Sequence, residues 1–210
     1  MTSFVKKIIP SSAIARARRL LEYWCWFASE KPNPPPHVLK VRVMRDYARR
    51  YGTREFVETG TYLGDTIEAV RQIFAHIYSI EIDGTLFRNA TELFKGDPRV
   101  SILLGDSAQV LPTVIASLSS PTLFWLDGHY SSGITGKGDK ETPIVEELLA
   151  IAASPILGHV ILIDDARLFN GTHDYPTSIE IKERAEKLWP AHVFEIKDDI
   201  IRIYPRTPRL

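Results

Sequence analysis

The fold is decided by residues 56–66, which read FVETGTYLGDT. An apolar run that ends in an acid, followed by glycines and a polar helix start, predicts a buried strand, a turn and a helix. Residues 78–83, YSIEID, end a second apolar run in another acid, Glu81. In an α/β sheet two such strand ends lie side by side at the carboxyl edge, where ligands bind. Glycine lets a ligand approach the backbone and Glu81 is placed to accept hydrogen bonds from two ribose hydroxyls, so the pattern predicts a nucleoside pocket.

The glycine spacing indicates which nucleoside is bound. A dinucleotide site uses three glycines, as G-x-G-x-x-G, whereas this turn has only Gly60 and Gly64 and adds the acids Glu58 and Asp65. The GKG at 136–138 lacks the hydroxyl residue that a P-loop needs after its lysine. A positively charged nucleoside without phosphate fits better, and S-adenosylmethionine is the common candidate. The spacing E-x-G-x-x-x-G resembles the first motif of the class I methyltransferases; the alternative is a βα turn that happens to contain two glycines.

This resemblance implies cofactor contacts at several strand ends. The turn after a third apolar run, GDSAQ at 105–109, is similar to the adenine-binding turn of the family, in which a short polar residue meets the base edge. The alternative is structural, because Asp106 or Ser107 can cap a helix at 107–117 without any ligand. The implied cofactor-binding residues are Glu58, Gly60, Thr61, Tyr62, Gly64, Thr66, Glu81, Ile82, Asp106, Ser107 and Asp127.

From Glu55 onward, strands and helices alternate, which is typical of an α/β fold with a parallel sheet and helices on both faces. The last two apolar runs, 193–196 and 200–204, are joined by a tight polar turn, so the final strand runs antiparallel to its neighbour. This order resembles the seven-stranded, mostly parallel, Rossmann-like sheet of the class I methyltransferases with its antiparallel C-terminal hairpin. We expect strands near 55–58, 77–81, 99–104, 121–126 and 158–163, and helices near 65–75, 84–95, 107–117, 143–153 and 177–188.

Two central apolar runs also end in acids, because Asp127 follows 121–126 and Asp164 and Asp165 follow 160–163. Adjacent parallel strands lie about 5 Å apart, so three carboxylates gather at one edge and repel one another unless a cation neutralises them. Oxygen ligation favours magnesium, with calcium or manganese as alternatives, over zinc. The pattern is also similar to the metal site of divalent-cation-dependent O-methyltransferases of the catechol and macrolide-sugar types, in which the metal holds two neighbouring hydroxyls of the acceptor. The alternative is that Asp165 caps a loop while Asp164 alone lines the pocket.

The residue after the Asp127-Gly128 pair is a candidate general base. The catechol type has a lysine three positions after its metal-binding aspartate, where this chain has Tyr130. His129 has an ordinary pKa near neutral, so we expect it to take the proton of the acceptor, with Asp127 as the second catalytic residue. The alternative is that His129 orients the loop or donates a hydrogen bond to the acceptor. The glycine-rich stretch 131–140 is expected either to close over the acceptor or to be a surface excursion.

Composition limits the remaining possibilities. The 210 residues contain 26 Lys+Arg and 26 Asp+Glu, so no overall positive charge recruits nucleic acid. No apolar run approaches the roughly 20 residues that span a bilayer, and the basic residues at 16–19 do not suit a signal peptide. The single cysteine, Cys25, suits a reducing compartment, and we expect it to pack as a small hydrophobe between two tryptophans. These features predict a cytoplasmic protein.

We expect an N-terminal arm, 1–36, and a methyltransferase-like domain, 37–210. The arm has a helix over 13–28 with a basic and an aromatic half, followed by the proline-rich connector 32–36. Three roles are open: packing on its own domain, contacting a second subunit of a homo-oligomer or gating the pocket, and lying on a membrane surface. A further amphipathic helix is expected over 38–51.

The pattern as a whole predicts an S-adenosylmethionine-dependent O-methyltransferase that acts on a hydroxyl of a small molecule or sugar with the assistance of a divalent cation. One rival is a metal-dependent hydrolase that uses Asp127, Asp164 and Asp165 to activate water. The other is a methyltransferase-like binding module without catalysis, which assembles through the tryptophan-rich arm.

Overall fold

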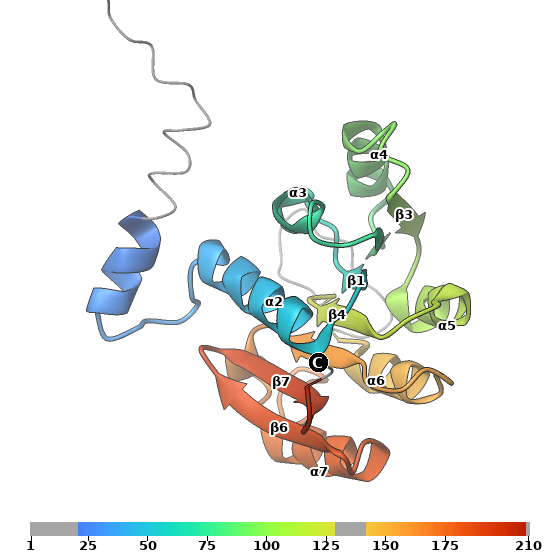
Figure 1. Cartoon of the computed structure of the whole chain (residues 1–210). Coiled ribbons are helices and arrows are strands. Elements are labelled where there is room, and N and C mark those ends of the chain that lie inside the picture. Colours follow the sequence, from blue (N-terminus) through green and yellow to red (C-terminus); the bar gives the residue numbers. More distant parts are fainter. Residues whose placement is uncertain (1–20, 129–141, 209–210) are drawn as a thin grey trace, which may run out of the picture.

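The computed structural model describes residues 21–128 and 142–208. Its strands and helices alternate from residue 55 as far as the sixth strand, and the last two strands form a hairpin (Figure 1). The strands are β1 (Glu55–Thr59), β2 (His76–Glu81), β3 (Val100–Leu104), β4 (Thr122–Leu126), β5 (Val160–Ile163), β6 (His192–Lys197) and β7 (Ile200–Pro205). The helices are α2 (His37–Tyr51), α3 (Asp65–Val70), α4 (Gly84–Leu93), α5 (Ser107–Ser117), α6 (Ile144–Ala152) and α7 (Ser178–Leu188), and a short 3-10 turn, η1 (Ala166–Leu168), follows β5.

All seven strands join one sheet in the order β3-β2-β1-β4-β5-β7-β6. Strands β1 to β5 pair in parallel, and β7 pairs antiparallel with both β5 and β6. The strand order reverses between β1 and β4, which is the place where ligands bind in open α/β sheets. The predicted Rossmann-like sheet with an antiparallel C-terminal hairpin is therefore confirmed.

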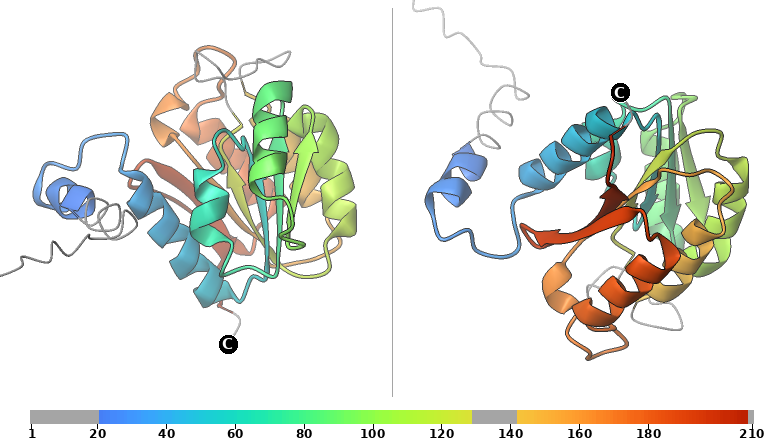
Figure 2. Two further views of the ribbon diagram at one scale, coloured as in Figure 1. Left: turned by 90° about the horizontal axis from the view of Figure 1, so that it is seen from above. Right: turned by 60° about the horizontal axis from the view of Figure 1, so that its bottom comes forward.

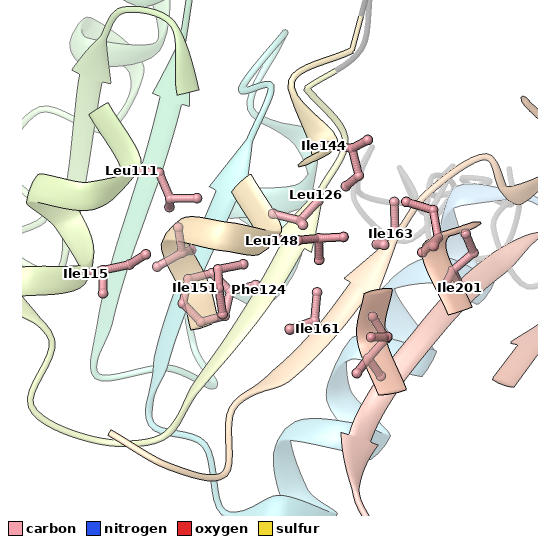
Figure 3. Close-up of a cluster of buried hydrophobic side chains, with 14 of the residues drawn as sticks. Leu111, Ile115, Phe124, Leu126, Ile144, Leu148, Ile151, Ile161, Ile163 and Ile201 are labelled. Carbon is pink, nitrogen blue, oxygen red and sulfur yellow. The ribbon is translucent and has the colours of Figure 1, made fainter. Parts of the chain in front are cut away.

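Helices cover both faces of the sheet, so the molecule has three layers (Figure 2). Successive side chains of a strand point to opposite faces, and β4 illustrates this: Leu123 and Trp125 pack with α2 and α3, whereas Phe124 and Leu126 pack with α5 and α6. Figure 3 shows the second of these clusters, in which Leu148 and Ile151 of α6 lie over the central strands. Because β4 and β5 are buried along their whole length, packing on both faces of the sheet fixes the position of their carboxyl ends.

Helix α3 is shorter than the sequence predicts. It ends at Val70, and residues 71–73 form a turn, although a helix was expected as far as residue 75. The reason is Phe74, whose buried ring packs at 5.0 Å between centroids against Phe56 of β1. The chain leaves the helix early to place this ring in the core beside the strand that follows.

The described part of the N-terminal arm is helical over residues 21–28, in agreement with the end of the helix expected at 13–28; residues 13–20 lie outside the described ranges. Trp26 is buried and donates a hydrogen bond from Nε1 to the carbonyl oxygen of Pro32 at 2.8 Å. Cys25 is exposed, so the expectation that it packs as a small hydrophobe was wrong. It lies on the outer side of the short helix while its neighbour Trp26 takes the buried position.

Within residues 21–128 and 142–208, no helix is long and apolar enough to cross a lipid bilayer.

Candidate active site at the carboxyl edge of the sheet

Acidic residues gather at the carboxyl ends of the five parallel strands. Glu58 is the penultimate residue of β1, Glu81 is the last residue of β2, and Asp106, Asp127 and Asp164 come just after β3, β4 and β5. The parallel register aligns these strand ends, since Thr59 pairs with Ile80 on one side and with Leu126 on the other. The predicted set of acids therefore lies along one edge, which divides into a β1–β3 half and a β4–β5 half.

Glu81 is held by the backbone around it. Its Oε2 accepts a hydrogen bond from the backbone N–H of Tyr62 at 2.8 Å, and its Oε1 accepts one from the N–H of Asp83 at 2.9 Å. A carboxylate offers about four acceptor positions, so among the described contacts each oxygen keeps room for one further donor. Tyr62 has a positive φ of 49°, an uncommon conformation for a tyrosine, and this turns its N–H toward Glu81. Two free acceptor positions side by side suit the two neighbouring hydroxyls of a ribose.

Glu58 lies deeper, at 1% exposure, in a chain of hydroxyl groups. It pairs with Ser79 in the strand register, and the Ser79 hydroxyl donates to Glu58 Oε2 at 2.7 Å while lying 2.7 Å from Thr61 Oγ1. Burial raises the pKa of Glu58 to about 8; hydrogen bonds from Ser79 and Thr66 oppose the rise, and the nearby charges of Asp127 and Glu81 add to it. A nearby positive charge would favour the ionised form of this carboxyl.

Gly60 joins the two halves of the edge. Its φ is +89°, and a Cβ at this position would lie 2.7 Å from the carbonyl oxygen of Asp127. Only glycine allows the turn after β1 to pass this close to the end of β4. Gly64 has a different role: a Cβ there would meet the ring of Phe94 at 2.7 Å, so its small size serves the packing of α3 against the end of α4.

The turn after β3 places Asp106 in a capping role. This residue is the N-cap of α5, and its side chain accepts a hydrogen bond from the N–H of Ala108 at 2.9 Å. Ser107 is the first residue of α5 and is buried. Two large apolar side chains, Ile82 and Leu104, are exposed beside this turn at the ends of β2 and β3. Exposed apolar groups next to polar caps form a suitable wall for an aromatic base.

In the β4–β5 half, cations face the acids. Asp164 is buried at 2% exposure, and Lys40 Nζ of α2 donates a hydrogen bond to its Oδ2. Its other oxygen, Oδ1, accepts the N–H of Asp165 at 2.9 Å. Burial lowers the pKa of Lys40, but the attraction of Asp164, Asp165 and Asp127 outweighs burial and holds the pKa above its ordinary value. The lysine is therefore a permanent cation at this edge.

Asp165 belongs to a second ion pair. Its Oδ1 accepts a hydrogen bond from Arg167 at 2.7 Å and lies 3.7 Å from Lys40 Nζ. Arg167 also pairs with Asp199 of the β6–β7 turn, and the N–H of Arg167 donates to Asp199 Oδ1 at 2.8 Å. These contacts fasten the segment after β5 to the C-terminal hairpin, which sequence reasoning did not anticipate.

The predicted metal ligands do not have the contacts of a divalent cation site. Both oxygens of Asp164 are engaged, one by an ammonium and one by a backbone N–H, and Asp165 faces a guanidinium. In the described part of the chain, no group of three His, Cys, Asp or Glu side chains is arranged to hold a metal ion. In this arrangement the side chains of Lys40 and Arg167 lie where a metal ion was expected.

Sequence reasoning missed Lys40, although a signal for it exists. Lys40 lies four, seven and eleven residues before Met44, Tyr47 and Tyr51, all of which are buried. This spacing puts the lysine on the buried face of α2, separate from the exposed arginines of the same helix. A charged residue within an apolar stripe requires a partner of opposite charge, and the two consecutive acids at the end of β5 are candidates that the sequence shows.

Some predicted features fall outside the described residues. His129, the candidate base, and the stretch 131–140 belong to residues 129–141, which the structure does not describe. Asp127 is described and lies two residues before them, and its backbone N–H donates to the carbonyl oxygen of Thr59 at 3.1 Å.

Comparison with known proteins supports the fold. No protein-family model matches the chain, and no curated protein sequence matches it. Among solved structures, the O-methyltransferase TomG from Streptomyces achromogenes, in complex with SAM, is similar with a TM-score of 0.58 and 14% identity over 90% of this chain and 89% of that one. The methyltransferase PaMTH1 from Podospora anserina, bound to SAH, has a TM-score of 0.56 and 17% identity over 98% of this chain and 100% of that one.

An N-methyltransferase is similar as well. NodS from Bradyrhizobium japonicum has a TM-score of 0.51 and 12% identity over 96% of this chain and 100% of that one. At these identities the likeness shows the fold, and the chain has the class I methyltransferase fold.

Proposed function

We propose that this chain, built on the class I methyltransferase fold, transfers a methyl group from S-adenosylmethionine to a hydroxyl oxygen of a small molecule or sugar. The observation that carries the proposal is Glu81, whose carboxylate is fixed by the N–H groups of Tyr62 and Asp83 beside the glycine turn of β1. This geometry leaves two acceptor positions for a pair of ribose hydroxyls at the end of β2, one strand from the point where the strand order reverses.

The charge of the β1–β3 half favours a cationic ligand. Glu58, Glu81 and Asp106 accept hydrogen bonds there from hydroxyl and backbone N–H groups, which are neutral. The negative charge of Glu81 and Asp106 is not cancelled by these contacts, so a sulfonium nucleoside is attracted where a pyrophosphate is repelled, and its positive charge would also favour the ionised form of Glu58. Ile82 and Leu104 supply exposed apolar surface for its base.

S-adenosylmethionine supplies an electrophilic methyl group, whose bond to sulfur breaks as the bond to the acceptor oxygen forms, leaving S-adenosylhomocysteine and a proton. The residues of the chain align the two partners and exclude water from between them. His129 is the proposed acceptor of the proton, and it follows Gly128 directly in the sequence. Oxygen as the acceptor atom is part of the proposal, since the structural neighbours include both O- and N-methyltransferases.

The divalent cation expected from the sequence is left out of this proposal, because no contact of the described residues supports it. Asp164 and Asp165 are paired with Lys40 and Arg167. No step of the reaction described above depends on a metal ion.

Isothermal titration of S-adenosylhomocysteine into the full chain tests the proposal. We expect wild type to bind and Glu81→Ala to bind roughly 10- to 100-fold more weakly, because two charge-assisted hydrogen bonds are lost. The matched control is Glu92→Ala on exposed α4, whose carboxylate only pairs with Lys95, and it should bind as wild type does. Equal affinity of wild type and Glu81→Ala would contradict the proposed site. Absence of binding in wild type, together with a phosphatase or esterase activity, would favour the hydrolase.

A further inference from the structure

Lys40 occupies a position that the stability of its own helix does not explain. It lies in the first turn of α2, where the helix dipole disfavours positive charge, and that turn contains no acidic residue. Its side chain is 15% exposed and lies on the same face of the helix as the buried residues Met44, Tyr47 and Tyr51. An ammonium group placed there loses most of its hydration and therefore needs acidic partners. Those partners lie at the carboxyl edge of the sheet.

Those partners are the acids expected to hold a metal. Lys40 Nζ contacts Oδ2 of Asp164, lies 3.7 Å from Oδ1 of Asp165, and is close enough to Asp127 for that carboxylate to affect it electrostatically. One ammonium group therefore contacts two of the three predicted ligands, while the third, Asp127, acts on it only electrostatically. Arg167 forms ion pairs with Asp165 and Asp199, and so neutralises part of the negative charge that Lys40 leaves.

We propose that the ammonium group of Lys40 replaces a divalent cation at the end of β5, so that this edge works without a metal ion and Lys40 is a positioning residue for Asp164 and Asp165. The consequence for methyl transfer rests on the proposed function, whereas the replacement of the cation does not. An ammonium group is a point charge with three donors and does not chelate. The acceptor therefore needs one hydroxyl, and a pair of neighbouring hydroxyls is not required.

The test is the binding of Mn²⁺ to the full chain, measured by electron paramagnetic resonance of the free ion. Wild type should bind Mn²⁺ only weakly, because Lys40 already occupies the acids. Lys40→Ala should bind it at least about tenfold more tightly, since the carboxylates then repel one another and attract a cation. The double variant Lys40→Ala/Asp164→Asn should lose this gain, which would locate the ion at Asp164.

Two controls separate charge from general disruption. Lys95→Ala removes an ammonium that pairs with Glu92 at 3.3 Å on the exposed surface, and it should leave Mn²⁺ binding unchanged. Lys40→Arg keeps the positive charge and should show no gain. Lys40→Met extends the apolar stripe, so it provides a folded variant without the charge if Lys40→Ala does not fold, and it should also bind Mn²⁺ more tightly than wild type.

The proposal is overturned if wild type binds Mn²⁺ tightly and Asp164→Asn abolishes that binding, because a metal site would then coexist with Lys40. It is also overturned if neither Lys40→Ala nor Lys40→Met binds Mn²⁺ more tightly than wild type. Titration of S-adenosylhomocysteine into the same wild-type sample keeps the two proposals apart: failure to bind it would reject the methyltransferase function, while the Mn²⁺ comparison would still judge Lys40.

Discussion

In the half of the carboxyl edge formed by β1, β2 and β3, acids accept hydrogen bonds from neutral groups, whereas in the β4–β5 half they face cations. Glu58 and Glu81 are bound by Ser79 and by backbone N–H groups, but Asp164 and Asp165 are bound by Lys40 and Arg167. Neutral donors position a carboxylate without cancelling its charge, while an ion pair cancels most of it. The difference teaches that the two halves of one sheet edge can differ in charge. The acids can attract a cationic ligand in the half where no lysine or arginine is paired with them.

The largest expected effect comes from breaking the ion pair of the β4–β5 half. Asp164→Asn leaves the ammonium of Lys40 without its main partner in a largely buried position. Removal of one member of a buried pair costs about 3 kcal/mol or more of the free energy of unfolding. Urea unfolding measures this loss. The matched control is Asp46→Asn, because Asp46 pairs with Arg42 of the same helix on an exposed surface, and such pairs contribute about 0–1 kcal/mol. If the two variants lose the same stability, the ion pair at the edge has no special role.

The corresponding substitution in the β1–β3 half, Glu58→Gln, should increase the free energy of unfolding at high pH, whereas Asp164→Asn decreases it. Burial raises the pKa of Glu58 to about 8, above its ordinary value of 4.5, so the folded state binds this proton more tightly than the unfolded state does. Glu58 therefore stabilises the fold fully below about pH 4.5, and that contribution is lost as the pH rises toward 8.

Glu58→Gln has no such titration. Its free energy of unfolding should rise relative to that of wild type between about pH 5 and pH 8, by a few kcal/mol, and the difference should stay constant above that range. Urea unfolding of both proteins across this pH range measures the difference. A difference that does not change with pH would mean that Glu58 is already ionised in the fold across this range, which would contradict the raised pKa that burial gives it.

The smallest expected effect separates capping from ligand binding at Asp106. Asp106→Ala should cost about 1 kcal/mol of stability, because the N-cap of α5 is lost. Asp106→Ser keeps a capping oxygen and should restore most of that stability, which thermal unfolding measures. Titration of S-adenosylhomocysteine then decides the second role: weaker binding by Asp106→Ser than by wild type indicates contact with the base, and unchanged binding restricts Asp106 to capping.

The sequence predicted some parts of this molecule better than others. The sheet and the β1–β3 half were predictable because their signals are local: apolar runs end in acids, and glycines follow at fixed spacing. The end of α3 was not predictable, since it depends on Phe74 packing against Phe56. The pairing of Lys40 with Asp164 joins residues 124 positions apart, and only the register of α2 on the sheet brings them together. For that reason sequence reasoning assigned these acids to a metal ion without considering Lys40 as their partner.

The central claim is that the neutral-donor half of the edge holds the cofactor while the lysine of the other half replaces a metal ion. A crystal structure of the full chain with S-adenosylhomocysteine, from crystals soaked in Mn²⁺ and measured for anomalous scattering, tests both parts at once. The account predicts the ribose hydroxyls on Glu81, Lys40 still bound to Asp164, and no anomalous peak at that aspartate. A Mn²⁺ ion between Asp127 and Asp164 with Lys40 displaced, or a nucleoside bound away from Glu81, would contradict it.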